Sequence, residues 1–358
     1  MSQIRVFVVD DSVVFRRLLL TAVNGIHGVR TVGVAGNGRE ALEVIPRVKP
    51  DLITLDLNMP VMDGLETLRV LHERYPRFGV VMVSAYTTEG AQATVRALEM
   101  GALDVIAKPD GKDEGENANF LRDQFASFLT KFVGAERSCD VDLNAHEDRK
   151  VPVLSAGFFG VEIGRRMKPE AIAVGLSTGG PAALAHLLPL LPAHLPLPVF
   201  IVQHMPRLFT KTLAESLQSK CRIRVVEASE GETVEAGTAY LAPGGKQMKV
   251  SREEKGVVVV RITDDPEENH CKPSVDYLFR SVSQVYEDKS VGVIMTGMGE
   301  DGVLGLRLMK RRGARTIAQD RQTSTVWSMP RTAYEAGVVD IMLPLQDIGP
   351  ELLRCIGC

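Results

Sequence analysis

The sequence predicts an α/β protein made of two doubly wound parallel-sheet domains that are joined by a linker. Short apolar runs of strand length alternate with amphipathic helical patterns in residues 1–133 and again in residues 169–358. The runs are apolar almost throughout, which is typical of parallel strands that helices cover on both faces. Residues 134–168 are charged in their first half and show neither period, so they are predicted to form the linker.

The composition indicates a soluble protein that can bury two cores. The chain has 358 residues, of which 45% are hydrophobic and 24% charged. A net charge of -3 argues against a surface that binds nucleic acid or an anionic membrane. No apolar run reaches the length of a membrane span, and the first residues read as a strand rather than a signal peptide. We therefore expect a cytoplasmic protein with no nucleic-acid partner and no direct membrane insertion.

The five cysteines do not follow the spacing of a disulfide framework, which fits a reducing compartment. Cys355 and Cys358 have C-x-x-C spacing at the end of the chain. Because no second pair accompanies them, we interpret this spacing as incidental rather than as a metal or redox site.

The first domain, residues 1–133, is predicted to contain five βα units. The expected strands are residues 4–9, 31–35, 52–55, 80–84 and 104–107. The expected helices are residues 13–24, 39–48, 65–75, 90–100 and 119–132. In such a sheet the functional crevice lies beyond the carboxyl ends of the strands.

Polar residues follow four of these strands. Three are carboxylates, a fourth is a hydroxyl and the fifth is an amine: Asp10, Asp11, Asp56, Ser84 and Lys108. Three carboxylates at one edge repel one another unless a cation joins them, and oxygen ligands of this kind suit Mg²⁺. A carboxylate beside Mg²⁺ can attack a phosphoryl group. Asp11 alone is better explained as a helix N-cap, but the whole group is far more specific.

The motifs DD at 10–11, LDLNMPVMDG around Asp56, SA at 84–85 and KP at 108–109 resemble the response-regulator receiver domain, which has a flavodoxin-like fold. This resemblance implies that Asp56 is the phospho-acceptor and that Ser84 and Lys108 contact the phosphoryl group. It also implies a Mg²⁺ site. The ligands would be the carboxylates of Asp10, Asp11 and Asp56 and the backbone carbonyl of Asn58. Many receivers have an aromatic residue three positions before the lysine. Here it is Val105, so a switch that buries that aromatic is not expected.

The second domain, residues 169–358, repeats the strand-then-helix order of a Rossmann-like sheet. The expected strands are residues 172–174, 199–203, 222–227, 291–295, 316–319 and 339–342. The expected helices are residues 182–191, 208–220, 275–285, 303–310 and 330–335. Residues 232–263 are rich in valine and turn residues, which predicts a β-hairpin or meander inserted into this framework.

Ser177 lies in a glycine-rich turn, GLSTGG, between the first of these strands and its helix. By itself such a turn can present a nucleophile, bind a phosphate or simply be tight. His204 follows the next strand, and Asp301 lies in the glycine-rich loop after the strand 291–295. The three residues reach one edge of one sheet, which favours the nucleophile over the phosphate site. The imidazole would take the serine proton, and the carboxylate would orient the imidazole.

Several other residues are weaker candidates. His186 and His194 are interpreted as surface or packing residues, and His146 as a solvated linker residue. His270 lies in a loop near the expected cleft without an expected direct role. Asp301 could instead cap a helix, and the adjacent Glu300 could be mistaken for the acid.

The segments GLSTGGP, QHMP, MTGMGEDG and SMPRTAYEAG resemble the catalytic domain of the chemotaxis protein-glutamate methylesterases, the CheB family, in which a receiver precedes this domain. The resemblance implies that Ser177 is the nucleophile, His204 the general base and then acid, and Asp301 the orienting carboxylate. The backbone N–H groups of Thr178 and Met298, in turns beside these three residues, are the candidates for the oxyanion hole. The sequence departs from the family pattern at two places. Leu176 stands where alanine is usual, and HCKPSVD replaces an HRPSVD-like segment. Neither departure is expected to touch the three catalytic residues.

The activity that this resemblance implies is hydrolysis of glutamate methyl esters on chemoreceptors through an acyl-enzyme, with release of methanol. Deamidation of receptor glutamines to glutamate is the expected second reaction. A chemotaxis-type histidine kinase would be the phosphodonor, and the esterase reaction itself would need no cofactor. A phosphorylation-gated binding module with a vestigial triad is the alternative. A DNA-binding regulator is disfavoured because no basic recognition helix is present.

Overall fold

The computed structural model describes residues 3–75, 78–85, 87–109, 111, 113–137 and 168–357. The chain forms two compact units that divide between Phe132 and Val133. Most of the predicted linker, with Cys139 and His146, lies outside the described residues. Helix α5 (Glu114–Arg137) begins five residues earlier than predicted and continues into the predicted linker.

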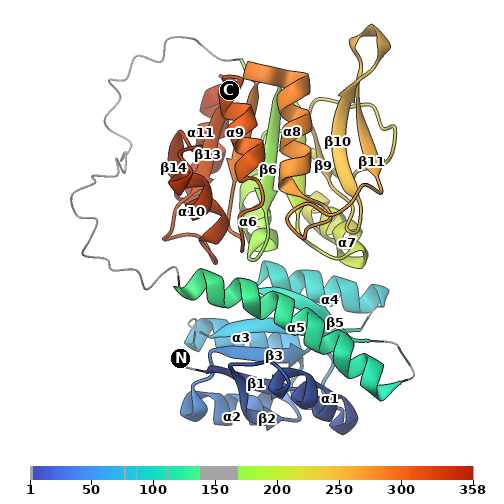
Figure 1. Cartoon of the computed structure of the whole chain (residues 1–358), viewed down its shortest axis with the longest axis vertical. Coiled ribbons are helices and arrows are strands. Elements are labelled where there is room, and N and C mark those ends of the chain that lie inside the picture. The colour runs from blue at the N-terminus through green and yellow to red at the C-terminus, as the bar shows by residue number, and fades with distance from the viewer. Residues whose placement is uncertain are drawn as a thin grey trace, which may run out of the picture. The chain divides into compact units, whose positions relative to one another are not determined.

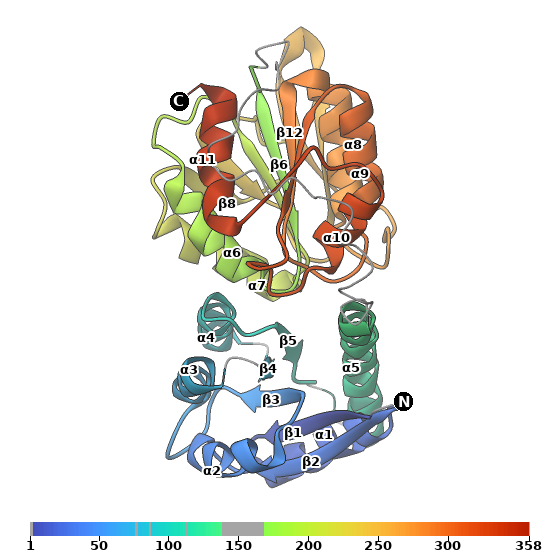
Figure 2. The ribbon, with the colours of Figure 1, turned by 90° about the vertical axis from the view of Figure 1, so that its left-hand side faces the viewer.

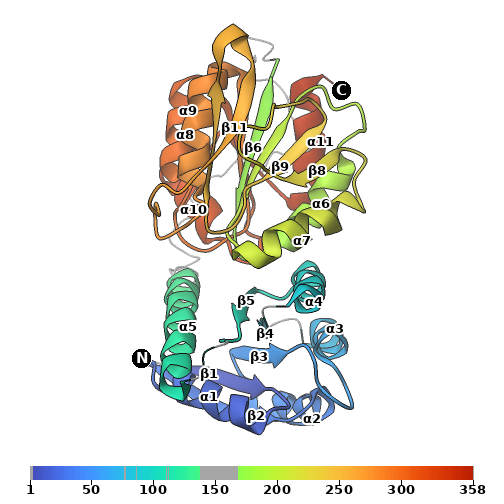
Figure 3. The same ribbon diagram turned by 90° about the vertical axis from the view of Figure 1, so that its right-hand side faces the viewer.

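The first unit is a five-stranded parallel sheet in the order β2-β1-β3-β4-β5. Its strands are β1 (Ile4–Val9), β2 (Val29–Ala35), β3 (Leu52–Asp56), β4 (Gly79–Ser84) and β5 (Asp104–Ala107). Its other helices are α1 (Val13–Asn24), α2 (Gly38–Val48), α3 (Gly64–Arg74) and α4 (Thr88–Glu99). Figures 2 and 3 show α1 and α5 on one face of the sheet and α2, α3 and α4 on the other.

The apolar strands explain this architecture. Residues 6–9 of β1 are fully buried, and all five residues of β3 are buried as well, because helices cover both faces. Helix α1 begins after Ser12, whose hydroxyl accepts a hydrogen bond from the Phe15 N–H at 3.2 Å. The strand order is that of flavodoxin-like folds, which places the switch point of the topology between β1 and β3.

The second unit is built on a seven-stranded parallel sheet in the order β14-β13-β12-β6-β7-β9-β8. Its strands are β6 (Ala171–Leu176), β7 (Val199–Gln203), β8 (Arg224–Glu227), β9 (Thr238–Leu241), β12 (Ser290–Ile294), β13 (Arg315–Gln319) and β14 (Ile341–Leu343). Helices α6 (Gly180–Leu187), α7 (Arg207–Gln218) and α11 (Leu345–Ile356) lie on one face of the sheet. Helices α8 (Val275–Tyr286), α9 (Val303–Arg311) and α10 (Ser328–Glu335) lie on the other. The two parallel sheets and their covering helices confirm the predicted fold class.

The segment 232–263 is only partly the predicted insertion. Strands β10 (Gln247–Arg252) and β11 (Val258–Thr263) pair antiparallel as a separate hairpin beside α8 (Figure 1). The preceding strand β9, however, belongs to the main sheet, where it lies between β7 and β8. The prediction of a single inserted unit was therefore wrong for β9. The four residues of β9 are buried on both faces, as a central strand requires.

Helix α11 was not predicted from the sequence. Its Gly349-Pro350 pair reads as a helix break, yet Ile348 and Leu352 point one turn apart into the core. Cys355 lies on this helix, with its Sγ 3.8 Å from Glu351 Oε1, and Cys358 lies outside the described residues. Among the helices of the described ranges, none is long and apolar enough to cross a membrane.

Candidate functional sites

The second unit brings the predicted catalytic residues to the carboxyl edge of its sheet. Leu176 of β6 pairs with Gln203 of β7, so Ser177 and His204 are the next residues of two neighbouring parallel strands. Asp301 lies in the loop between β12 and α9, and β12 flanks β6 on its other side. In the sheet, β7 and the strands beyond it lie on one side of β6, and β12, β13 and β14 lie on the other. The site therefore lies at the topological switch point, where ligands bind in open α/β sheets.

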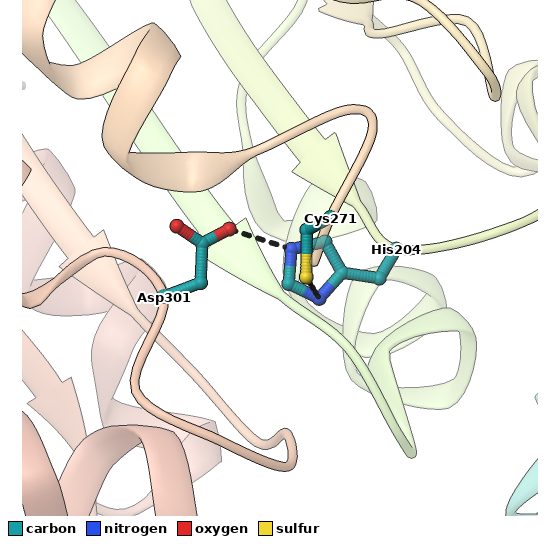
Figure 4. A group of neighbouring side chains, drawn as sticks. All are labelled: His204, Cys271 and Asp301. Carbon is teal, nitrogen blue, oxygen red and sulfur yellow. Dashed lines mark hydrogen bonds and ion pairs between the residues drawn. The ribbon is translucent and has the colours of Figure 1, made fainter. Parts of the chain in front are cut away.

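His204 and Asp301 are joined directly. His204 Nε2 lies 2.8 Å from Asp301 Oδ2, and both side chains are largely buried (Figure 4). Because Nε2 is engaged by the carboxylate, Nδ1 is the ring nitrogen left to exchange a proton with a nucleophile. In the serine-protease template the two nitrogens have the opposite roles.

The start of helix α8 holds the Asp301 carboxylate. Its oxygens accept four further hydrogen bonds, from Asn269 Nδ2 at 3.0 Å, Ser274 Oγ at 2.8 Å, Val275 N at 2.7 Å and Asp276 N at 3.0 Å. Burial alone raises the pKa of this carboxyl, but His204 and these donors outweigh burial and hold the pKa below its usual value. Asp301 is therefore an ionised, fixed acceptor for the imidazole.

A second buried carboxylate, Asp276, lies behind Asp301. Asn269 Nδ2 donates to Asp276 Oδ2 at 2.8 Å as well as to Asp301, and the Gly305 N–H donates to Asp276 Oδ1 at 2.7 Å. Burial, with Asp301 adding to it, raises the pKa of Asp276 to about 6 in spite of these two donors. Asn269 thus links the two acids of this loop.

Cys271 contacts the other nitrogen of the imidazole. Its Sγ lies 3.7 Å from His204 Nδ1 (Figure 4). The same Sγ lies 3.3 Å from the carbonyl oxygen of Asn269. Burial lowers the pKa of His204, but Cys271 and Asp301 more than compensate and raise it to about 10. The expectation that HCKPSVD does not touch the catalytic residues was therefore wrong. Cys271 is 67 residues from His204 in sequence, and only its position just before α8 could have indicated the contact.

Ser177 is positioned through its backbone. Its N–H donates to the Thr296 carbonyl at 3.0 Å, and its carbonyl accepts from Gln203 Nε2 at 2.9 Å. The same Nε2 lies 3.1 Å from the carbonyl oxygen of His204, so Gln203 joins the turn that holds Ser177 to the turn that holds His204. Gln203 is buried, and sequence reasoning missed it although it directly precedes His204. Among the described residues, no hydrogen bond joins the Ser177 hydroxyl to His204.

Of the two candidate oxyanion donors, Thr178 follows Ser177 in the chain and Met298 lies in the nearby turn after β12. Thr178 and Met298 are both buried, and no hydrogen bond within the described part of the chain uses either backbone N–H. A Cβ atom at Gly297 would lie 2.8 Å from Ser177 Cβ, so this glycine lets the Met298 turn approach the serine closely.

The remaining polar candidates differ from His204 and Asp301 in their exposure. His186 on α6, His194, His270 and Glu300 are all exposed. Their exposure fits the weaker roles expected of them.

The first unit brings a second set of predicted residues together. Lys108 Nζ lies 2.8 Å from Asp10 Oδ2 and 2.7 Å from Asp56 Oδ2, and both carboxylates are buried. Burial raises the pKa of Asp56 and outweighs the opposing effect of Lys108. Oxygen atoms of Asp10, Asp11 and Asp56 lie within 4.8 Å of one another. Such an all-oxygen donor set fits Mg²⁺.

Ser84 and Lys108 lie side by side at the ends of β4 and β5. Ser84 pairs with Ala107, and the Lys108 N–H donates to the Ser84 carbonyl at 2.8 Å. Val105 on β5 is buried. It occupies the position at which many receiver domains have an aromatic residue. Asn58 is exposed and lies two residues after Asp56 in the chain.

Comparison with known families divides the chain in the same way. Residues 6–118 match the model of the response regulator receiver domain, and residues 172–352 match that of the CheB methylesterase. A protein-glutamate methylesterase/protein-glutamine glutaminase of Desulfotalea psychrophila is 41% identical over 99% of both chains. One of the same description from Archaeoglobus fulgidus is 42% identical, over 98% of this chain and 97% of its own. The crystal structure of the Thermotoga maritima CheB methylesterase catalytic domain is 36% identical, has a TM-score of 0.51 and covers 52% of this chain and 98% of its own.

Proposed function

The chain belongs to the CheB family of protein-glutamate methylesterases, and from that premise we propose that Ser177, His204 and Asp301 hydrolyse glutamate methyl esters on chemoreceptors. The observation that supports this most is the fixed His204–Asp301 pair, with Ser177 in register beside His204. The names of the relatives support methylesterase and glutaminase activity for this chain.

The proposed reaction begins with attack of Ser177 Oγ on the γ-carbonyl of the ester. His204 Nδ1 takes the serine proton, because Nε2 is held by Asp301. The N–H groups of Thr178 and Met298 stabilise the oxyanion of the tetrahedral intermediate. His204 then gives the proton to the leaving methoxide, so methanol departs and an acyl-serine remains.

The second half of the reaction reverses these roles. His204 takes a proton from water, the resulting hydroxide attacks the acyl-serine, and Ser177 regains its proton as glutamate leaves. A glutamine side chain can enter the same cycle, with ammonia as the leaving group in place of methanol. Asp301 remains ionised throughout because its four other donors and His204 stabilise its charge.

The receiver domain, residues 1–133, is proposed to accept a phosphoryl group from a histidine kinase on Asp56. Asp10, Asp11 and Asp56, with the carbonyl of Asn58, would hold Mg²⁺, whose charge offsets that of the phosphoryl group. Lys108, which is paired with Asp56, and Ser84, at the end of the adjoining strand, are proposed to contact the phosphoryl oxygens. Phosphorylation would then raise the esterase activity of the domain 169–358, to which the linker 134–168 connects the receiver.

A methanol-release assay on methylated receptor membranes tests this function against the alternative of a binding module. The purified chain is expected to release methanol, and a small phosphodonor with Mg²⁺ is expected to raise the rate. Receptor binding without methanol release in either condition would favour the binding module and overturn the proposed esterase.

A further inference from the structure

Two strong metal ligands lie next to each other in the catalytic domain. His204 Nδ1, at the end of β7, and Cys271 Sγ, in the loop before α8, are 3.7 Å apart, and both can offer a lone pair (Figure 4). One ring nitrogen of His204, Cys271 Sγ and an oxygen of Asp301 form a group of possible ligand atoms that all lie within 4.8 Å of one another. This cluster is separate from the carboxylates of the receiver.

We propose that His204 Nδ1 and Cys271 Sγ bind a thiophilic divalent cation such as Zn²⁺ and that the bound ion inhibits the esterase. A tetrahedral ion with a Zn–N bond of about 2.0–2.1 Å and a Zn–S bond of about 2.3 Å holds the two donors about 3.5 Å apart. The observed separation of 3.7 Å needs only a small adjustment to reach this value.

Asp301 completes the arrangement from behind the imidazole. Histidines that bind metal generally give the N–H of their other ring nitrogen to a carboxylate, which fixes the tautomer and the ring orientation. His204 Nε2 already lies 2.8 Å from Asp301 Oδ2. Four further hydrogen bonds saturate this carboxylate, so Asp301 orients His204 rather than coordinating the ion.

The donor types distinguish this site from that of the receiver. An imidazole and a thiolate select Zn²⁺ and similar soft ions, whereas the carboxylates around Asp56 suit Mg²⁺. Binding releases the thiol proton of Cys271, together with any proton held on His204 Nδ1, to solvent, and forms one sulfur–metal and one nitrogen–metal bond. Two protein ligands leave the other coordination positions to water, so the ion should be exchangeable.

Inhibition follows from the shared nitrogen, and this part rests on the proposed function. An ion on His204 Nδ1 occupies the lone pair that would take the proton of Ser177. The bound ion and the proton transfer therefore exclude each other.

The site itself is tested by titrating the full chain with Co²⁺ in buffer containing Mg²⁺ and reading the thiolate-to-cobalt charge-transfer band in the near ultraviolet. Cys221→Ser is the matched control, because Cys221 is a free, half-buried thiol outside the donor clusters of the described residues. The band is expected in the wild-type chain and in Cys221→Ser and is expected to be lost in Cys271→Ser. Zn²⁺ should abolish the band by displacement.

A band that persists unchanged in Cys271→Ser, or no band in the wild-type chain, would overturn the site. Circular dichroism checks that Cys271→Ser folds. If it does not fold, His204→Gln serves instead, and this variant is expected to weaken Co²⁺ binding at least tenfold. Unchanged binding by His204→Gln would equally contradict the proposal.

Inhibition is tested in the methanol assay. Zn²⁺ should inhibit the wild-type chain and Cys221→Ser alike, a zinc-selective chelator should restore the rate, and Cys271→Ser should need at least tenfold more Zn²⁺. Equal sensitivity of Cys271→Ser would refute inhibition at this site. If the wild-type chain releases no methanol, the proposed function fails, while the cobalt band still decides the metal site.

Discussion

The Sγ of Cys271 lies 3.7 Å from Nδ1 of His204, the nitrogen that takes the serine proton in the proposed esterase reaction. Asp301 holds the other ring nitrogen, so both nitrogens have a partner in this structure. A nucleophile must therefore compete with the thiol for the base. This relationship shapes both the pH dependence of the reaction and its response to metal ions.

The pH dependence of kcat/KM should reflect the raised pKa of His204, which is about 10. Only the neutral imidazole can take a proton, so kcat/KM should rise about tenfold per pH unit below that pKa. Cys271→Ala removes a neighbour that raises this pKa, so the rise should move to lower pH. Methanol release measured between about pH 6 and pH 9 checks this. A wild-type profile that is flat above about pH 7 would show that His204 titrates near its ordinary value.

Asp301→Asn should lower kcat by about 10⁴-fold, because a neutral amide neither fixes the tautomer of His204 nor stabilises the imidazolium. Glu300→Gln is the control, since Glu300 is the adjacent acid but is exposed. Steady-state methanol release measures both variants. Equal losses in the two variants would mean that Asp301 has been wrongly assigned.

Gln203→Ala should lower kcat while changing KM little, because the buried amide positions the backbone of Ser177 and His204. Small displacements of catalytic groups can cost up to about 100-fold in rate. Two part-buried carbonyls also lose a hydrogen bond, and the Ser177 carbonyl keeps the Gly180 N–H, so the free energy of unfolding should fall by only about 1 kcal/mol. Chemical denaturation and steady-state kinetics on one preparation measure both effects. Unchanged kcat would show that this link is not needed for catalysis.

Asp56→Asn should leave the basal esterase rate intact and abolish its increase with a small phosphodonor, because the phospho-acceptor is removed. Asp123→Asn, on the exposed surface of α5, is the matched control and should still respond. If Asp56→Asn responds like the wild-type chain, phosphorylation of Asp56 does not regulate the enzyme.

Much of the fold follows from local pattern. The bounds of β1, α1 and β5 agree with prediction because buried apolar runs and a serine N-cap mark them in the sequence. Strand β9 and helix α11 could not be predicted in the same way. The place of β9 in the sheet depends on pairing with distant strands. The Gly349-Pro350 pair of α11 is tolerated only because the helix packs on its neighbours.

The meeting of Ser177, His204 and Asp301 was predictable because each follows a strand, and the carboxyl ends of parallel strands meet at one edge. Their supporting residues were not. Asn269, Ser274 and Cys271 come from a loop whose approach to His204 and Asp301 depends on how α8 packs against β6 and β12. No local pattern carries that information.

The most direct test of this account is methanol release from methylated receptor by Ser177→Ala. Loss of the nucleophile is expected to lower kcat on the order of a million-fold, to the background rate. Circular dichroism matching the wild-type chain would show that the variant is folded. A folded Ser177→Ala variant that kept more than about a hundredth of the wild-type kcat would contradict the assignment of Ser177 as the nucleophile.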